Sequence, residues 1–333
     1  MSDDYEFDLH AIHRTKIHSI VLGSLCTIPP LSVVIILSIR YKLLVGERRL
    51  VHYIYLIAAA EAIVSLCIAI GFPESSSFLC ASQGFLTVFF SRAAIFFTDV
   101  LIFQLFYLIL FKKYFLKLKY DHLIVWSLNL ALQLIPFSTG TVYGQDDDDG
   151  GTAVGISVQR CEFGVGSGTL DEEILWAAYA YQLVLIVSFV FILFFTLVIL
   201  VYRSRTSISE KSWSTLLLYP IGLLITYVPS SVYDYYFKSY LYDHNKFPKH
   251  GFVISNELLS MNAIYGVILS LIFYTNNKDA VYEWKKILFG ITDDDNYDNY
   301  DNRSSVISIA STVEFSTRSS ENPIISTRRV ELD

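Results

Sequence analysis

Seven separate stretches of the sequence are apolar and long enough to cross a bilayer, and this pattern constrains the fold more than any other feature. A spanning helix needs about 20 mostly apolar residues. The stretches are Ile17–Ile39, Leu50–Phe72, Cys80–Phe111, Leu123–Gly140, Leu175–Tyr202, Ser214–Phe237 and Ile254–Thr275. Each tends to be apolar all round rather than alternating, which favours helices over barrel strands. Only 17% of the 333 residues are charged, against about 25% in soluble domains. The sequence therefore predicts an all-α membrane protein, a seven-transmembrane helix bundle within residues 17–290.

The loop charges predict how this bundle is oriented. With the N-terminal segment 1–16 outside, the inner loops carry fourteen Lys and Arg and the outer loops carry six. The positive-inside rule therefore favours an extracellular N-terminus and a cytoplasmic C-terminus. The acidic flank of the first stretch and its length argue against a cleavable signal peptide. We expect a multi-pass protein of the plasma membrane.

Two of the four cysteines fall on the predicted outer face. Cys80 opens the third stretch, and Cys161 lies in the long loop 141–174. Both face an oxidising compartment, in which a disulfide persists, so we expect a bridge that tethers the loop to the third helix. Two free thiols are the alternative. Cys26 and Cys67 lie within spans, where lone cysteines behave as small hydrophobes.

Three ionisable residues, Glu61, Arg92 and Asp99, lie inside the predicted spans. A charge at the bilayer centre costs roughly 2.5–3.5 kcal/mol, so such residues normally face the bundle interior and find a partner. The rise of a helix places both Glu61 and Arg92 near the membrane midplane, and Asp99 shares one helix face with Arg92. We predict one buried polar network, in which Glu61 and Arg92 contact each other or share a polar partner. A static packing network and a conformational switch fit the sequence equally well.

Other polar residues are candidates for lining an outer ligand cavity. Helix-packing hydrogen bonds explain them as well, and an aromatic belt is the alternative around Tyr233. The candidates are Arg160, Tyr181, Gln182, Tyr233, Glu257 and Asn262. The run Asp146–Asp149 lacks the alternating ligand spacing of a calcium loop, and the chain has no glycine-rich phosphate loop, HExxH or CxxC. We therefore expect no metal, no cofactor and no enzyme activity.

A set of short motifs then follows in a recognisable order. In chain order they are Arg49-Leu50-Val51-His52-Tyr53, Phe78-Leu79-Cys80-Ala81-Ser82-Gln83-Gly84, Trp126, Ile135-Pro136, Tyr143-Gly144, Cys161, Leu216-Leu217-Leu218-Tyr219-Pro220, Tyr227-Val228-Pro229 and Asn262-Ala263-Ile264-Tyr265-Gly266. Over residues 17–290 this set resembles the slime-mould cyclic AMP receptor and cAMP-receptor-like family of G-protein-coupled receptors. The resemblance implies a cell-surface receptor that activates a heterotrimeric G protein.

The sequence departs from the family pattern at two places. Tyr227, two residues before Pro229, stands where the family has Trp, and these two residues are the candidate hinge of the sixth helix. The second outer loop reads Arg160-Cys161-Glu162 in place of Trp-Cys-Trp and carries an acidic insert, which opposes an anionic nucleotide. The extracellular ligand therefore stays open, with cyclic AMP as one possibility.

The predicted inner loops are short and basic. This charge suits contact with a G protein, and it follows equally from topology and from binding to the lipid bilayer; it gives no reason to expect nucleic acid. The candidate G-protein-facing residues are Arg40, Lys42, Arg48, Arg49, Lys112, Lys113, Lys117, Lys119, Arg203, Arg205 and Lys211.

Two segments follow the last span. Residues 279–289 place Val281, Trp284, Ile287 and Leu288 at helical spacing, which predicts a short amphipathic helix on the membrane. Residues 291–333 are polar and predict a disordered tail, with eleven Ser or Thr between 304 and 333. These hydroxyls suit a receptor kinase and arrestin-like proteins, and an inert terminus is the alternative.

The competing class is a seven-span transporter. Transporters often carry internal repeats with paired broken helices, and we find no similarity between the first three apolar stretches and the last three. The long outer loop and the Ser/Thr-rich tail favour a receptor.

Overall fold

The computed structural model describes residues 9–39, 49–71, 78–138, 172–205, 216–244 and 251–289. These parts of the chain contain helices and no strand. The helices are α1 (Leu9–Ile39), α2 (Arg49–Ala69), α3 (Phe78–Phe111), α4 (Leu118–Ser138), α5 (Glu172–Arg205), α7 (Leu218–His244), α8 (Gly251–Asn276) and α9 (Lys278–Phe289). Each of the seven predicted apolar stretches falls largely on one of the long helices.

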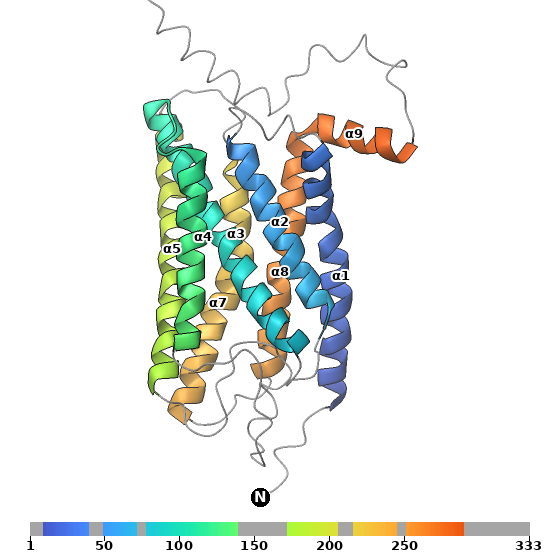
Figure 1. Cartoon of the computed structure of the whole chain (residues 1–333), viewed down its shortest axis with the longest axis vertical. Coiled ribbons are helices and arrows are strands. Elements are labelled where there is room, and N and C mark those ends of the chain that lie inside the picture. Colours follow the sequence, from blue (N-terminus) through green and yellow to red (C-terminus); the bar gives the residue numbers. More distant parts are fainter. Residues whose placement is uncertain are drawn as a thin grey trace, which may run out of the picture.

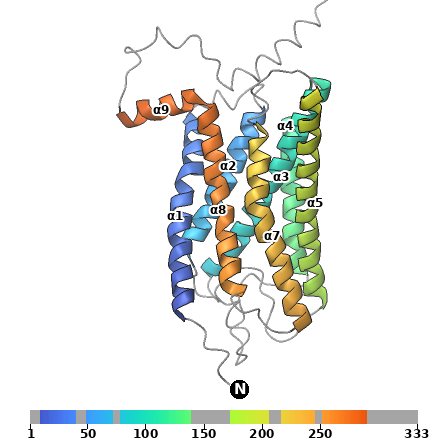
Figure 2. The ribbon, with the colours of Figure 1, turned by 180° about the vertical axis from the view of Figure 1, so that it is seen from behind.

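The long helices run side by side, and α9 lies across one end of them (Figure 1). Helix α2 packs between α1 and α3, while α8 packs against α1, α2 and α7. Helix α5 contacts α3 and α7, and α4 packs mainly on α3. From behind, α8 and α7 stand in front of α2 and α3 (Figure 2). Helices α2 and α3 therefore form the centre of the bundle.

The bundle is apolar on its outside as well as in its core. Four of the described helices contain segments long and apolar enough to cross a membrane: Ile17–Ile39, Arg49–Ala69, Ser82–Phe111 and Leu183–Tyr202. Large apolar side chains are exposed along α1, α4 and α5, for example Leu25, Leu123 and Val190. Such continuous apolar faces are stable against lipid rather than water. The protein is an all-α membrane protein.

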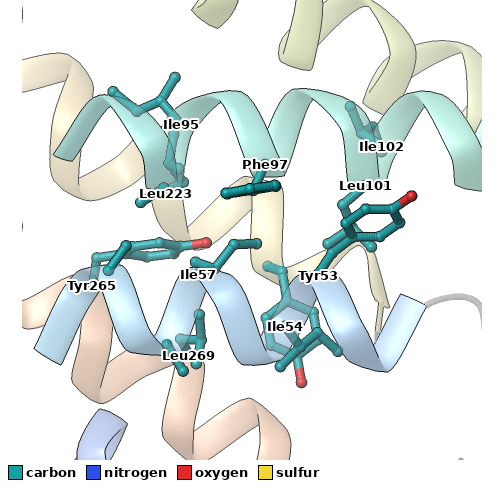
Figure 3. Close-up of a cluster of buried hydrophobic side chains, with 14 of the residues drawn as sticks. Tyr53, Ile54, Ile57, Ile95, Phe97, Leu101, Ile102, Leu223, Tyr265 and Leu269 are labelled. Carbon is teal, nitrogen blue, oxygen red and sulfur yellow. The ribbon is translucent and has the colours of Figure 1, made fainter. Parts of the chain in front are cut away.

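The core is built where α2, α3, α7 and α8 meet. Ile57 of α2, Phe97 of α3, Leu223 of α7 and Tyr265 of α8 are all fully buried, and they converge from the four helices in Figure 3. These side chains fill the centre of the bundle and surround the buried polar groups described below.

Most helix ends differ by several residues from the ends of the predicted stretches, and two of the differences have a clear local cause. Helix α2 ends at Ala69 rather than Phe72, because Gly71 has a φ of 79°, a left-handed conformation that favours glycine and terminates helices. The Gln83 side chain of α3 donates to the carbonyls of Cys67 and Gly71 at 2.6 and 2.7 Å, satisfying acceptors that a helix end leaves open. Pro220, expected within a span, lies in the first turn of α7, where proline is tolerated.

The predicted amphipathic segment is helical and is joined to the bundle by hydrogen bonds. Trp284 of α9 donates to the hydroxyl of Tyr274 at 2.8 Å, and that hydroxyl lies 2.7 Å from the Ser32 hydroxyl of α1. Trp284 is half-buried, whereas Ile287 and Leu288 are exposed. One face of α9 therefore packs on the bundle and another is left apolar and exposed.

Candidate functional site

The most deeply buried carboxylate of the described chain is Glu61 of α2, with 0% of its surface exposed. The hydroxyl of Tyr227 on α7 donates to its Oε1 at 2.8 Å, while Oε2 makes no hydrogen bond within the described residues. Helix α8 approaches closely at Gly266, where an added Cβ would lie 3.3 Å from the Cβ of Glu61. Glu61, which the sequence predicts to face the bundle interior, is buried among the described helices.

Tyr227 joins three helices at this point. Besides its bond to Glu61 of α2, its hydroxyl lies beside Ser91 of α3. Its ring meets that of Tyr265 of α8 edge to face, with 5.9 Å between centroids. Tyr227 is 2% exposed and precedes Pro229, the proline inside α7. A change at this hinge would therefore act on contacts to α2, α3 and α8 together.

A second polar contact lies one turn further along α7. The Ser230 hydroxyl bonds Oδ1 of Asn262 on α8 at 2.8 Å and lies 2.9 Å from the carbonyl oxygen of Tyr227. Asn262 is 6% exposed and makes a contact between two helices, which is the packing alternative considered for it.

The other two charges of the predicted network lie on α3. Arg92 is 1% exposed, and Asp99 is half-buried and hydrogen-bonded to Ser188 of α5. Asp99 thus meets α5, whereas Glu61 meets α7. The predicted contact between Glu61 and Arg92 stays a prediction, since the bond resolved for Glu61 is the one from Tyr227.

A separate polar cluster lies at the end of the bundle that carries α9. Its centre is Asp121 of α4, 3% exposed, which accepts a hydrogen bond from the hydroxyl of Tyr53 on α2. Gln104 of α3 donates to both Asp121 oxygens, at 3.3 and 3.1 Å, and accepts from the backbone N–H of Phe115 at 3.0 Å. One carboxylate therefore ties together α2, α3, α4 and the turn between α3 and α4.

Three further side chains complete this second cluster: Arg49 and His52 of α2 and His122 of α4. Arg49 donates to the carbonyl of Leu116 at 2.8 Å and lies 4.6 Å above the centre of the Tyr114 ring. His52 and His122 of α4 face each other, with 2.9 Å between their Nε2 atoms, so one imidazole donates and the other accepts. Arg49, predicted to face a G protein, here holds the α3–α4 turn.

The sequence reading missed this second cluster. Two signals were available in the sequence. Gln104 lies within the apolar stretch Cys80–Phe111, and the pair Asp121-His122 directly precedes the stretch Leu123–Gly140. They did not suffice, because Gln104 and Asp121 meet only once the turn between α3 and α4 has folded.

Most other predicted site residues cannot be placed as side chains. Arg40, Lys42, Arg48, Arg160, Cys161 and Lys211 lie outside the described residues, and Cys80, Tyr181, Gln182, Arg203, Arg205 and Glu257 are described only as positions on α3, α5 and α8. Cys26 and Cys67 are buried and free. Tyr233 is half-buried on α7, with its ring centre 6.2 Å from that of Tyr236. The disulfide and the ligand cavity therefore stay predictions.

Comparison of the chain with protein-family models and with curated proteins found no match.

Proposed function

We propose that this protein is a G-protein-coupled receptor of the cAMP-receptor-like type, in which α1 to α5, α7 and α8 cross the plasma membrane. The N-terminus would face outside and α9 would lie on the cytoplasmic surface. Seven long helices packed side by side, with a shorter helix across one end, support this topology. The exposed lysines of the α3–α4 turn lie at the α9 end, in agreement with the positive-inside rule.

The observation that carries the proposal is the hydrogen bond from Tyr227 to Glu61 at 2.8 Å. It joins α7 to α2 inside the bundle, two residues before the proline that interrupts the backbone hydrogen bonding of α7. A ligand bound at the outer end of α7 would change the conformational equilibrium only if it bound the two arrangements of α7 with different affinity. Breaking the Tyr227 contact is the step that would release α7 toward a G protein.

The remaining features of the receptor are parts of the same proposal. A Cys80–Cys161 bridge would hold the second outer loop near the ligand cavity. The extracellular ligand is open, with cyclic AMP as one candidate, and the tail after Gly290 would bind a receptor kinase and arrestin-like proteins once phosphorylated.

Ligand-driven nucleotide exchange tests the proposal against the transporter alternative. Cells producing the full chain and a promiscuous G protein would be exposed to cyclic nucleotides and to pooled extracellular metabolites. The same compounds would be offered in an uptake assay to vesicles containing the protein. A receptor accelerates nucleotide exchange with at least one compound and accumulates none of them, whereas accumulation without exchange would contradict the proposal.

A further inference from the structure

The turn between α3 and α4 reverses the chain within residues 112–117. Helix α3 ends at Phe111, and Lys112 has a φ of 56°, the left-handed conformation that stops helices. Helix α4 begins at Leu118, where the backbone N–H of Tyr120 bonds the carbonyl of Lys117 at 2.9 Å. Because the apolar span of α3 ends at Phe111, the turn lies where such a helix leaves the hydrocarbon core.

The conformation of this turn is held from three sides. Gln104 of α3 accepts from the N–H of Phe115, and Arg49 of α2 donates to the carbonyl of Leu116. The carboxylate of Asp121 on α4 in turn accepts hydrogen bonds from the side-chain amide of Gln104. A loop fixed in this way loses little further conformational entropy when it binds a ligand.

The turn and the start of α4 carry four lysines. Lys112, Lys113, Lys117 and Lys119 are all exposed. The one acidic residue between positions 100 and 138 is Asp121, which is 3% exposed and hydrogen-bonded to Tyr53 and Gln104. Four exposed lysines therefore lie within residues 112–119, and no exposed carboxylate from α4 or from the end of α3 offsets their charge.

Aromatic side chains accompany the lysines. Phe111, Phe115 and Tyr120 are 54%, 51% and 45% exposed. Aromatic rings beside lysines at the end of an apolar span are typical of groups that lie at the level of lipid headgroups. A purely electrostatic surface for a soluble anion has no need of these rings.

We propose that this basic turn, residues 111–120, is a binding site for the headgroup of a polyphosphorylated anionic lipid, a phosphoinositide, in the adjacent leaflet. Several lysines held at fixed positions can contact several phosphates of one headgroup, while Phe111 and Phe115 insert among the acyl chains. The inference places the lipid on the cytoplasmic side, so that point rests on the proposed orientation. The binding itself does not depend on receptor activity.

The test measures lipid binding by the full-length protein in nanodiscs. Three compositions are compared: phosphatidylcholine alone, phosphatidylcholine with phosphatidylserine, and phosphatidylcholine with phosphatidylinositol bisphosphate at matched total charge. Native mass spectrometry counts retained lipids, and hydrogen exchange reports protection of residues 111–120. The site variant replaces all four lysines of the turn with glutamine. The matched control replaces Lys278, Lys285 and Lys286 of α9 with glutamine.

A lysine near an anionic surface contributes about fivefold in affinity. Single changes such as Lys113→Gln should therefore weaken phosphoinositide binding about fivefold, and the four-lysine variant should weaken it more than tenfold. The α9 control should keep more than half of the phosphoinositide that the unmodified protein retains. Because the four lysines at positions 112, 113, 117 and 119 are exposed, the variants at these positions should fold, and the single variants keep the test valid if the fourfold variant does not.

Two further measurements distinguish a lipid site of fixed geometry from attraction by total charge alone and from a site for a soluble anion. Gln104→Met keeps every lysine but removes the acceptor of the Phe115 N–H, so it should weaken phosphoinositide binding several-fold and leave phosphatidylserine retention unchanged. The soluble inositol phosphate headgroup should bind at least tenfold more weakly than the lipid. Equal retention of the two anionic lipids, loss of binding in the α9 control instead of the turn variant, or equally tight binding of the soluble headgroup would overturn the proposal.

Discussion

Replacing Gly23 with alanine should force α1 and α2 apart, because this buried glycine of α1 lies directly against the backbone of α2. An added Cβ would lie 2.5 Å from the backbone nitrogen of Ala69, 2.9 Å from the carbonyl carbon of Ile68 and 3.0 Å from the Cα of Ala69. All three atoms belong to the backbone of the end of α2, so no side-chain rotation relieves the overlap. Overpacking of this kind typically costs 1–3 kcal/mol.

The matched control is Gly222→Ala in α7. Its added Cβ would meet the Cγ2 of Ile268 at 3.0 Å and ring atoms of Tyr265 at 3.6 and 3.8 Å, and the Ile268 methyl can move. Both substitutions gain about 1 kcal/mol of helix propensity, so the control should be neutral or stabilising. Gly23→Ala should be clearly destabilising by comparison.

Thermal unfolding in nanodiscs measures the difference. One kcal/mol corresponds to roughly 2–4 °C in soluble domains of 150–250 residues, so Gly23→Ala should unfold several degrees below Gly222→Ala. Equal unfolding temperatures for the two variants, or a more stable Gly23→Ala protein, would refute the close packing of α1 on α2.

Three further experiments test the site and the proposed receptor features. Tyr227→Phe removes the donor to a buried carboxylate and should cost about 1–2 kcal/mol in thermal unfolding; in a Glu61→Met background the same change should cost nearly nothing. Cys80 and Cys161 should be recovered as one cross-linked peptide by mass spectrometry of a non-reduced digest, and reduction should lower the unfolding temperature. Truncation after Gly290 should leave surface delivery and signalling intact and slow desensitisation in a cell assay, because the phosphorylatable hydroxyls are lost.

Each of these expectations has a contradicting result. An unchanged cost of Tyr227→Phe in the Glu61→Met background would show that the hydroxyl acts elsewhere. Recovery of Cys80 and Cys161 as two free thiols would rule out the bridge. Desensitisation of the truncated protein at the rate of the full chain would make the tail an inert terminus.

Sequence reasoning located the helices because lipid constrains them strongly. An apolar stretch of sufficient length has few alternatives to a helix in a bilayer, and α9 was evident from the spacing of Trp284 and its apolar neighbours. Helix ends were less predictable. Gly71 stops α2 because of its left-handed backbone, and the pattern of apolar residues continues past it.

The partners of buried polar groups were not predictable, and Glu61 shows the reason. The cost of a charge in lipid predicts that Glu61 faces the bundle interior, and the rise of a helix gives its depth. The rotation of each helix about its axis depends on packing against all neighbours, so the donor could not be read from depth alone. Tyr227, considered only as part of a hinge, proved to be that donor. Asp121 and Gln104 come into contact only because the turn between α3 and α4 folds back. The spacing of apolar residues does not predict the path of such a turn.

The most direct test of the account is the rate of nucleotide exchange on a purified heterotrimeric G protein, measured with the receptor in nanodiscs. The unmodified protein should accelerate exchange above empty nanodiscs. Tyr227→Phe should raise the basal rate severalfold, since a loss of 1–2 kcal/mol shifts a conformational equilibrium about five- to thirtyfold. Tyr219→Phe, which alters an equally buried tyrosine of α7, should leave the rate unchanged. No acceleration by the folded, unmodified protein, together with identical rates for both variants, would contradict a receptor whose switch is the Tyr227–Glu61 contact.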